Sequence, residues 1–264
     1  MAFNFTVCFL YFCKEMNEHL SHLDLPETTL EHRNIILNKP FLKRIYVEWY
    51  TAFKNYSEQQ SLTGKIVEIG SGGGFIKDIY PDVITSDIMP LSVCDMQFSA
   101  EQMPFENNSV KAIFMLNVLH HIPDNEKFFR EAQRVLKKDG FIYMIEPATT
   151  WFSKFIYKNF HHEPFDEKRE DWKFESKGPL SDANGAIPWI IFKRDYQKFK
   201  NYFPELELTA FTFHTPIKYL LSGGLSKPNL VPYFLFGCIS FIEKILSPFN
   251  SKIALFQTII VSKK

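Results

Sequence analysis

A glycine cluster directly after a short apolar segment constrains this chain more than any other feature. Residues 65–69 form a run typical of a buried parallel strand. Four glycines follow within five residues: Gly70, Gly72, Gly73 and Gly74. Glycines tolerate positive φ angles and let a ligand approach the backbone closely. We expect a helix over residues 75–80, whose first N–H groups would face the same ligand. This order predicts a bound nucleotide, although an ordinary glycine-rich turn has the same composition.

Two carboxylates sharpen this prediction. Glu68 lies in the predicted buried strand, where a carboxylate is costly unless donors satisfy it. Asp87 ends the next apolar run, on the order of 20 residues after the glycines, where nucleotide-binding α/β folds place a ribose-binding carboxylate. Phe75 stands where a dinucleotide motif has its third glycine or alanine. The pattern therefore weakens the case for a dinucleotide such as NAD.

Composition limits the classes of partner. The chain has 264 residues, enough for one large domain, and 45% of them are hydrophobic. Lys plus Arg equals Asp plus Glu, at 30 each, so there is no electrostatic case for a nucleic-acid partner. The cysteines show no metal-type spacing and no small disulfide framework, which favours a reducing cytoplasm: Cys8, Cys13, Cys94 and Cys238. The 28 phenylalanines suggest a greasy substrate or a membrane surface, with plain core packing as the alternative.

Strand and helix patterns alternate from residue 65, which predicts a parallel α/β sheet. The expected strands are residues 65–69, 83–87, 93–98, 110–116, 140–146, 206–213 and 253–261. The expected helices in this part are residues 124–137, 149–160 and 192–203, with a long loop over 161–188.

The part before the sheet is predicted to be helical over residues 14–62, with breaks at Pro26 and near Pro40. After Pro40 an aromatic stripe at helical spacing either packs on the sheet or forms a lid over the cofactor: Phe41, Ile45, Trp49 and Phe53. Residues 1–13 carry no charge, lack the features of a signal peptide and are too short to span a bilayer.

Further segments extend the match beyond the glycine turn, which reads Glu68-x-Gly70-x-Gly72-x-Gly74. They are SAEQMPF over 99–105, NVLHHI over 117–122 and RVLKKDGF over 134–141. Over about residues 65–147 this ordered set resembles the class I S-adenosylmethionine (SAM) dependent methyltransferases, in particular the methyltransferase type 11 group. The resemblance implies a Rossmann-like sheet of seven mostly parallel strands, one of them antiparallel, with helices on both faces. It also implies SAM lying across the carboxyl ends of the strands.

The same resemblance assigns roles to individual residues. The loop beside the methionine part of SAM would be Gly70, Ser71, Gly72 and Gly74, with Glu68 orienting it. Asp87 would bind the ribose hydroxyls, Ala100 and Glu101 would neighbour the adenine, and Asn117 would lie near the methionine end. Ser99 replaces the aspartate that accepts the adenine amino group in many relatives. Adenine recognition would then pass to backbone groups or to Asp95.

Candidate catalytic residues come from two histidine pairs. A methyl group on a sulfonium transfers in line, so alignment supplies most of the rate, and an oxygen acceptor also needs a base. His121 and His120 follow the fourth strand, and His161, His162 and Glu163 follow the fifth. Each pair can equally cap a helix or pack. We expect no metal site, because adjacent residues rarely aim at one ion and no His-x-x-x-His spacing occurs.

The sequence therefore predicts a single methyltransferase domain with an N-terminal helical cap (1–62), a SAM-binding core (63–147) and acceptor-side and lid elements (148–264). The acceptor would be a small molecule, a glycan or a lipid-linked intermediate. The alternatives are a SAM-binding protein without turnover and, disfavoured by Phe75, an NAD-dependent oxidoreductase. Base methylation is disfavoured because residues 117–120 replace the Asn/Asp-Pro-Pro-aromatic motif.

An apolar insertion, residues 215–250, precedes the last strand. Residues 228–242 carry no charge but fall short of the roughly 20 residues of a membrane span. A helix from Tyr233 would carry a polar stripe of Gly237, Ser240, Lys244 and Ser247. Its apolar face would comprise Phe234, Leu235, Cys238, Phe241, Ile242, Ile245 and Leu246. That face would be buried in the core, against a dimer partner, or in a membrane surface through residues 229–249. Gly223 and Gly224 would act as its hinge.

Overall fold

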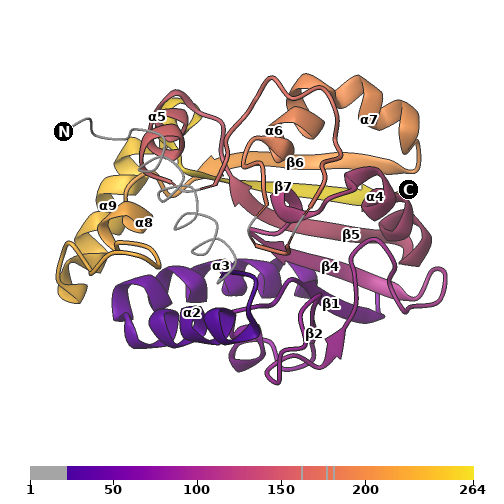
Figure 1. The fold of residues 1–264 in the computed structure, drawn as a ribbon, viewed down its shortest axis with the longest axis horizontal. Coiled ribbons are helices and arrows are strands. Elements are labelled where there is room, and N and C mark those ends of the chain that lie inside the picture. Colours follow the sequence, from indigo (N-terminus) through magenta and orange to yellow (C-terminus); the bar gives the residue numbers. More distant parts are fainter. Residues whose placement is uncertain (1–22, 162, 177, 181) are drawn as a thin grey trace, which may run out of the picture.

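A seven-stranded sheet organises the protein, as the computed structural model shows for residues 23–161, 163–176, 178–180 and 182–264 (Figure 1). The strand order is β3-β2-β1-β4-β5-β7-β6. The strands are β1 (Lys65–Ile69), β2 (Ile84–Asp87), β3 (Met96–Gln97), β4 (Val110–Leu116), β5 (Leu136–Pro147), β6 (Leu206–His214) and β7 (Phe256–Lys263). Only β7 runs antiparallel to its neighbours β5 and β6. The predicted fold class is confirmed.

Both faces of the sheet are buried, which explains why its central strands are almost continuously apolar. In β4, Ile113 and Met115 join the core on one face, while Ala112 and Phe114 join the core on the other. The first face is covered by α4 (Asn125–Val135), α6 (Ile187–Trp189) and α7 (Tyr196–Tyr202). The second face is covered mainly by α3 (Pro40–Glu58).

The N-terminal helices begin where the prolines predict. Proline opens both α2 (Pro26–Asn38) and α3, as expected for a residue that lacks an N–H and fits the first helical turn. The aromatic stripe of α3 packs on the sheet, and the ring of Phe53 stacks on that of Phe114 at 4.8 Å between centroids. The packing interpretation of this stripe is therefore confirmed.

Two predicted elements around the glycine turn are much shorter than expected. Residues 75–80 form only a single 3-10 turn, Ile76–Asp78, because Pro81 disfavours helical angles at the residue before it. The third strand, expected over 93–98, is reduced to β3, which pairs with Ser86 and Asp87. Residues 75–80 therefore do not form the helix whose first N–H groups were expected to face a ligand.

The remaining helices follow β5 and β6. Thr150 and Ser153 form a reciprocal capping box at the start of α5 (Trp151–Phe160). The helix expected over 192–203 is divided into α6, a π-helical turn Ile190–Arg194 and α7. The insertion contains α8 (Lys218–Leu221), α9 (Phe236–Leu246) and α10 (Asn250–Ile253), and Figure 1 places α8 and α9 at one end of the sheet, in yellow.

The side of the insertion helix that packs on the protein is not the apolar face that the sequence predicted. The side of α9 that packs on the protein consists of Phe236, Ile239 and Glu243. The predicted apolar face is largely exposed: Phe234, Cys238, Phe241, Ile242 and Ile245. Because α9 is apolar almost all round, its periodicity could not decide which side is buried.

Within the described residues, no helix has the length and apolarity needed to cross a membrane. Cys94 and Cys238 are free thiols, while Cys8 and Cys13 lie outside the part of the chain that the structure describes.

Candidate active site

A cavity of about 1990 Å³ lies at the carboxyl ends of β1, β2, β4 and β5. Its walls come from the glycine turn, α2, the end of α5 and the turn around Gly223 and Gly224. Every predicted cofactor residue lines it: Glu68, Gly70, Ser71, Gly72, Gly74, Asp87, Ala100, Glu101 and Asn117. His120, His121, His161 and Glu163 line it too, whereas His162 lies outside the described residues. The fold thus gathers the predicted residues into one space.

The glycine turn needs glycine at particular positions. Gly70 and Gly72 have φ angles of +64° and +38°, in the left-handed region. A Cβ atom on Gly70 would lie 2.6 Å from Cγ2 of Val118, so a side chain there would clash. A Cβ atom on Gly73 would lie 3.0 Å from the backbone nitrogen of Arg33, in α2. The turn is therefore packed by both α2 and α3, since a Cβ atom on Gly74 would lie 2.1 Å from the hydroxyl of Tyr50, in α3.

Asp87 ties the turn to the second strand. Its Oδ2 accepts a hydrogen bond from the backbone N–H of Gly72 at 3.0 Å, and its Oδ1 accepts one from Met89 at 3.0 Å. Burial raises the pKa of this carboxyl, while these backbone N–H groups oppose the shift. Each oxygen retains a second lone pair, so Asp87 can still accept hydrogen bonds from a ligand.

Glu68 is a buried carboxyl with unused capacity. Its side chain is 2% exposed, and its Oε2 has no hydrogen-bond partner among the described residues. Burial raises its pKa to about 8. A buried, unsatisfied acceptor that lines a cavity fits a cationic ligand group, and the ammonium of the methionine part of SAM is such a group.

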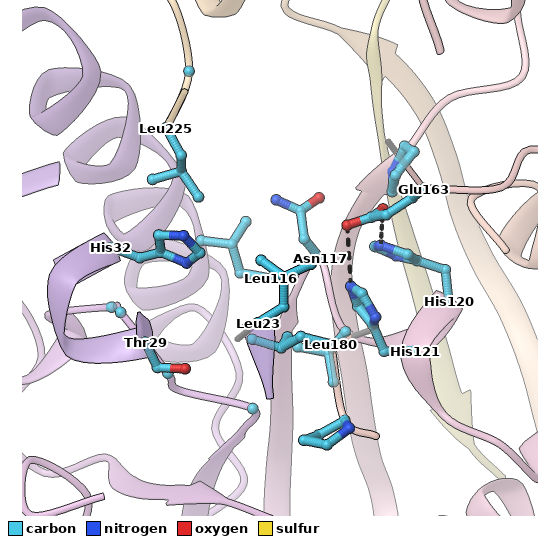
Figure 2. A pocket seen from close by; sticks show the side chains of 18 of the residues that line it. Leu23, Thr29, His32, Leu116, Asn117, His120, His121, Glu163, Leu180 and Leu225 are labelled. Atoms are coloured by element: carbon cyan, nitrogen blue, oxygen red, sulfur yellow. Dashed lines mark ion pairs between the residues drawn. The ribbon is translucent and has the colours of Figure 1, made fainter. Parts of the chain in front are cut away.

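Asn117 offers a second unsatisfied acceptor at the end of β4. Its φ angle is +57°, a conformation that asparagine tolerates better than most residues. Its Oδ1 is buried, and it too has no hydrogen-bond partner in the described part of the chain. Figure 2 shows Asn117 at the middle of the cavity, with Thr29 and His32 of α2 on one side and the histidines on the other. The residues present therefore fit SAM.

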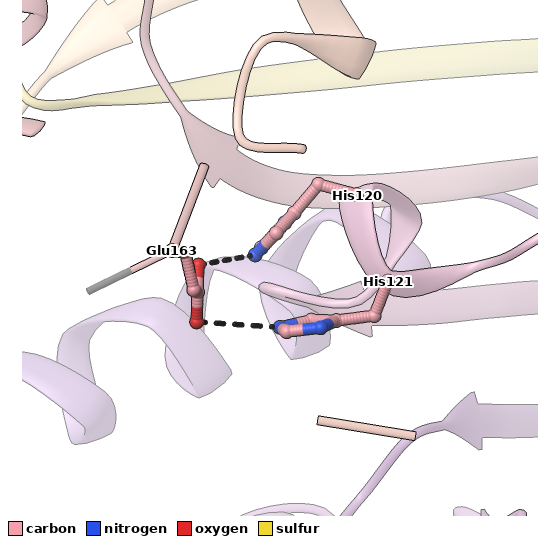
Figure 3. Close-up of side chains that lie close together, drawn as sticks. All are labelled: His120, His121 and Glu163. Atoms are coloured by element: carbon pink, nitrogen blue, oxygen red, sulfur yellow. Dashed lines mark ion pairs between the residues drawn. The ribbon is translucent and has the colours of Figure 1, made fainter. Parts of the chain in front are cut away.

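The histidines after β4 meet two carboxylates from distant parts of the chain. Both histidines lie on a 3-10 turn, Leu119–His121. Nδ1 of His120 lies 2.6 Å from Oε2 of Glu146, whose Oε1 also accepts the backbone N–H groups of Val118 and Leu119. Nε2 of His120 lies 3.3 Å from Oε2 of Glu163, and Nε2 of His121 lies 3.6 Å from Oε1 of Glu163 (Figure 3).

This environment separates the pKa values of the two imidazoles. Burial lowers the pKa of His120, but the carboxylates of Glu146 and Glu163 outweigh it and raise the pKa to about 10. Burial, together with the charge of His120, lowers the pKa of His121 to about 4. Burial opposes ionisation of Glu163, but the three surrounding histidines hold its pKa below the usual range. One imidazole is thus charged and its neighbour neutral.

The structure regroups the predicted catalytic residues. Glu163 was expected to act with His161 and His162, but it faces His120 and His121, and His161 Nδ1 is 3.7 Å from its Oε2. Sequence reasoning missed Glu146, although a carboxylate ending a buried strand is the signal that identified Glu68. Asp95 is not placed for adenine: it accepts from Lys77 Nζ and Thr85 N and does not line the cavity.

Comparison with known proteins agrees with this geometry. Residues 67–144 match a family model described as a methyltransferase domain, and no curated protein sequence matches the chain. A structure from Haloferax volcanii, described as a complex between the Trm112 methyltransferase activator and a methyltransferase, superposes with a TM-score of 0.50 at 12% identity, covering 91% of this chain and 95% of that one. It shows the same fold.

Two further solved structures are similar. Geranyl diphosphate C-methyltransferase from Streptomyces coelicolor has a TM-score of 0.49 at 13% identity, with coverage of 88% of this chain and 82% of that one. A SAM-dependent methyltransferase from Archaeoglobus fulgidus has a TM-score of 0.48 at 14% identity, with coverage of 83% and 94%. The methyltransferase-domain match over residues 67–144, the shared fold and a cavity that fits SAM together support a SAM-dependent methyltransferase.

Proposed function

We propose that the protein methylates a lipid-linked acceptor at a membrane surface. The observation that carries this proposal is the connection between the cavity and exposed apolar side chains. Phe160 and Leu230 line the cavity, yet they are 74% and 65% exposed. A soluble polar acceptor has no need of an apolar entrance, whereas a lipid tail does.

The entrance leads to what we name the α9 apolar face, which consists of Leu230, Tyr233, Phe234, Phe241, Ile242, Ile245 and Phe249. Each of these side chains is exposed, and Phe234 is 78% exposed. Neighbouring α5, which contacts α10, exposes Trp151 and Phe155 as well. Monomeric proteins seldom leave so many large apolar side chains together in one region without a partner or a lipid surface.

Charge around the α9 apolar face suits an anionic lipid. Residues 226–253 expose Lys227, Lys244 and Lys252. Glu243 is the single acidic residue of this segment, and its side chain is buried, with Oε1 accepting the backbone N–H groups of Ile217 and Lys218. The segment therefore presents only positive charge beside apolar side chains, as interfacial helices do.

SAM supplies an activated methyl group on a sulfonium. We assign Glu68 to its ammonium and Asp87 to its ribose hydroxyls, with the glycine turn along its backbone and Ala100 and Glu101 beside its adenine. The acceptor's nucleophile forms a bond to the methyl carbon while the carbon–sulfur bond breaks and its electron pair stays on sulfur. Because the positive charge disappears, alignment contributes most of the rate enhancement.

The group of His120, His121 and Glu163 would then orient the acceptor and take up its proton. His121 is the better candidate base, because its side chain is 13% exposed against 2% for His120 and its imidazole is neutral. His120 is held between Glu146 and Glu163 and would fix the geometry of the group. A protein that only bound SAM would have no need of this arrangement.

Sedimentation with vesicles tests the membrane part of the proposal. Wild-type protein should sediment with vesicles that contain anionic phospholipids, and Phe234→Glu with Phe241→Glu should release it. The matched control is Val93→Glu with Tyr202→Glu, which changes two exposed apolar residues elsewhere and should still sediment. Unchanged circular dichroism and SAM binding would show that the variants are folded. If wild-type protein stays in the supernatant, the acceptor is a soluble molecule.

A further inference from the structure

We infer that His120, His121 and Glu163 form a binding site for one divalent transition-metal ion. Each of the three residues offers one ligand atom, a ring nitrogen or a carboxylate oxygen, and these atoms all lie within 4.8 Å of one another. Two imidazoles and one carboxylate are a ligand set typical of Zn²⁺ and of similar ions such as Fe²⁺ and Co²⁺. Mg²⁺ and Ca²⁺ prefer oxygen ligands alone, so they fit this site less well.

The outer contacts of both histidines fix the ring nitrogen that is left for a ligand. Nδ1 of His120 contacts Oε2 of Glu146 at 2.6 Å, and Nδ1 of His121 contacts the backbone oxygen of Asp182 at 3.3 Å. Since these oxygens can only accept, each Nδ1 carries a proton, and Nε2 is the ring nitrogen left for a metal ion. Histidines that bind metals are usually held in this way, by a carboxylate or a carbonyl oxygen behind the ring.

The opposing atoms then require a cation between them. With Nδ1 protonated, Nε2 of the neutral His121 presents a lone pair to the Glu163 carboxylate, while Nε2 of His120 faces the same carboxylate and holds a proton as long as no metal ion is bound. Facing acceptors repel unless a proton or a metal ion lies between them. Charge-assisted hydrogen bonds are typically about 2.7–2.9 Å long. The distances here are 3.3 Å and 3.6 Å.

Those distances match metal coordination better. Ligand atoms about 2.1 Å from a tetrahedral ion lie about 3.4 Å from one another. The His120 Nε2–Oε2 and His121 Nε2–Oε1 separations both lie near this value, although they end on the two different oxygens of the Glu163 carboxylate. The site also lies on the cavity wall, so positions not taken by protein can face the acceptor (Figures 2 and 3).

A metal ion at this site would add a catalytic role to the proposed function. Only that catalytic role rests on the proposed function; the binding site itself does not. Bound to the ion, a hydroxyl of the acceptor would lose its proton to solvent water more readily, because the ion would stabilise the resulting alkoxide. The imidazoles would then act as ligands rather than as the base. The proton that His120 shares with its carboxylates would leave when the ion binds.

Metal binding to tag-free protein tests the site directly. We expect one Zn²⁺ per chain after dialysis, measured by elemental mass spectrometry, and a four-coordinate visible spectrum with Co²⁺. Losing an outer-shell partner costs about 10–100-fold in metal affinity. His120→Ala, His121→Ala and Glu163→Gln, which remove ligands, should therefore weaken Zn²⁺ binding by at least about 100-fold. His32→Ala, across the cavity from the site, should leave it unchanged (Figure 2).

A second measurement covers variants that fail to fold. Proton magnetic resonance of the Co²⁺-loaded wild type should show two strongly shifted exchangeable signals, from the Nδ1–H groups of His120 and His121. Absence of bound Zn²⁺, absence of these signals, or equal affinity in the ligand variants would overturn the site. Methyl transfer that persists in metal-free protein would remove the ion's catalytic role and leave the methyltransferase assignment intact. Metal binding without methyl transfer to any acceptor would contradict the methyltransferase assignment and leave the metal site intact.

Discussion

At the scale of single residues, the cofactor site depends on buried groups that the protein leaves partly unsatisfied. Asp87 uses one lone pair of each oxygen on the backbone, and Glu68 leaves Oε2 without a partner among the described residues. An unmet hydrogen bond in a buried place costs about 1–3 kcal/mol, which SAM can recover on binding. Replacing either carboxylate should therefore affect SAM binding, but in different ways.

Asp87→Ala should weaken SAM binding by roughly 1.5–3 kcal/mol, the range for a hydrogen bond to a charged group. Titration calorimetry with SAM and with S-adenosylhomocysteine measures this loss. Asp82→Ala is a suitable control, because Asp82 is exposed and does not line the cavity. Tight binding of NADH with no heat from SAM would contradict the assignment of the cofactor.

Glu68 should couple SAM binding to pH. Its pKa in the folded protein is raised from 4.5 to about 8, so below pH 8 the free protein holds it mostly protonated. The contribution of this raised pKa to stability is complete below about pH 4.5 and is lost as the pH rises through 8. Since the ammonium of SAM needs the carboxylate, binding at pH 7 should release a proton.

Calorimetry in buffers with different ionisation enthalpies measures that proton. Glu68→Gln should release less and should flatten the rise in SAM affinity between pH 6 and 8. Equal proton release by the wild type and the variant would show that Glu68 does not contact the ammonium.

At the scale of elements, capping groups position the segments that carry the site. The hydroxyl of Thr150 accepts the backbone N–H of Ser153 and donates to the backbone oxygen of Ala254, so it joins α5 to the chain before β7. The chain reaches Glu163 shortly after the end of α5. The position of this helix therefore influences where the carboxylate lies.

Thr150→Ala should lower the free energy of unfolding by about 1 kcal/mol, the usual cost of losing an N-cap. Urea unfolding followed by circular dichroism measures the change. The matched control is Thr149→Ala, whose hydroxyl has no hydrogen-bond partner in the described part of the chain. An equal loss in both variants would mean that the cap contributes nothing specific.

The elements also show what the sequence could predict. Apolar runs, prolines and the Asp124 cap correctly predicted β1, β4, α3 and the start of α4. The exposed side of α9 was not predictable, because its residues are apolar all round and only the contacts of Phe236, Ile239 and Glu243 decide it. Likewise, Glu163 reaches His120 and His121 only through the path of the chain after β5.

At the scale of the whole molecule, the cavity joins three parts of the chain that the sequence separates. The division into a helical cap, a SAM-binding core and acceptor-side elements remains a prediction. The cavity wall nonetheless includes α2, the glycine turn and the turn around Gly223 and Gly224. Gly223 and Gly224 have φ angles of +71° and +53°, and Lys39 Nζ donates to the backbone oxygens of Gly224 and Lys227. The segment expected to be a hinge is thus a turn that is hydrogen-bonded to Lys39, between α2 and α3.

The most direct measurement follows a labelled methyl group from SAM to its acceptor. Purified protein, SAM labelled in its methyl group and a membrane lipid extract should give label in the organic phase, with a methylated lipid identified by mass spectrometry. His121→Ala should reduce this transfer on the order of 10²-fold while SAM affinity is kept. Label that enters only water-soluble molecules, or no transfer with any lipid fraction, would contradict a lipid-linked acceptor.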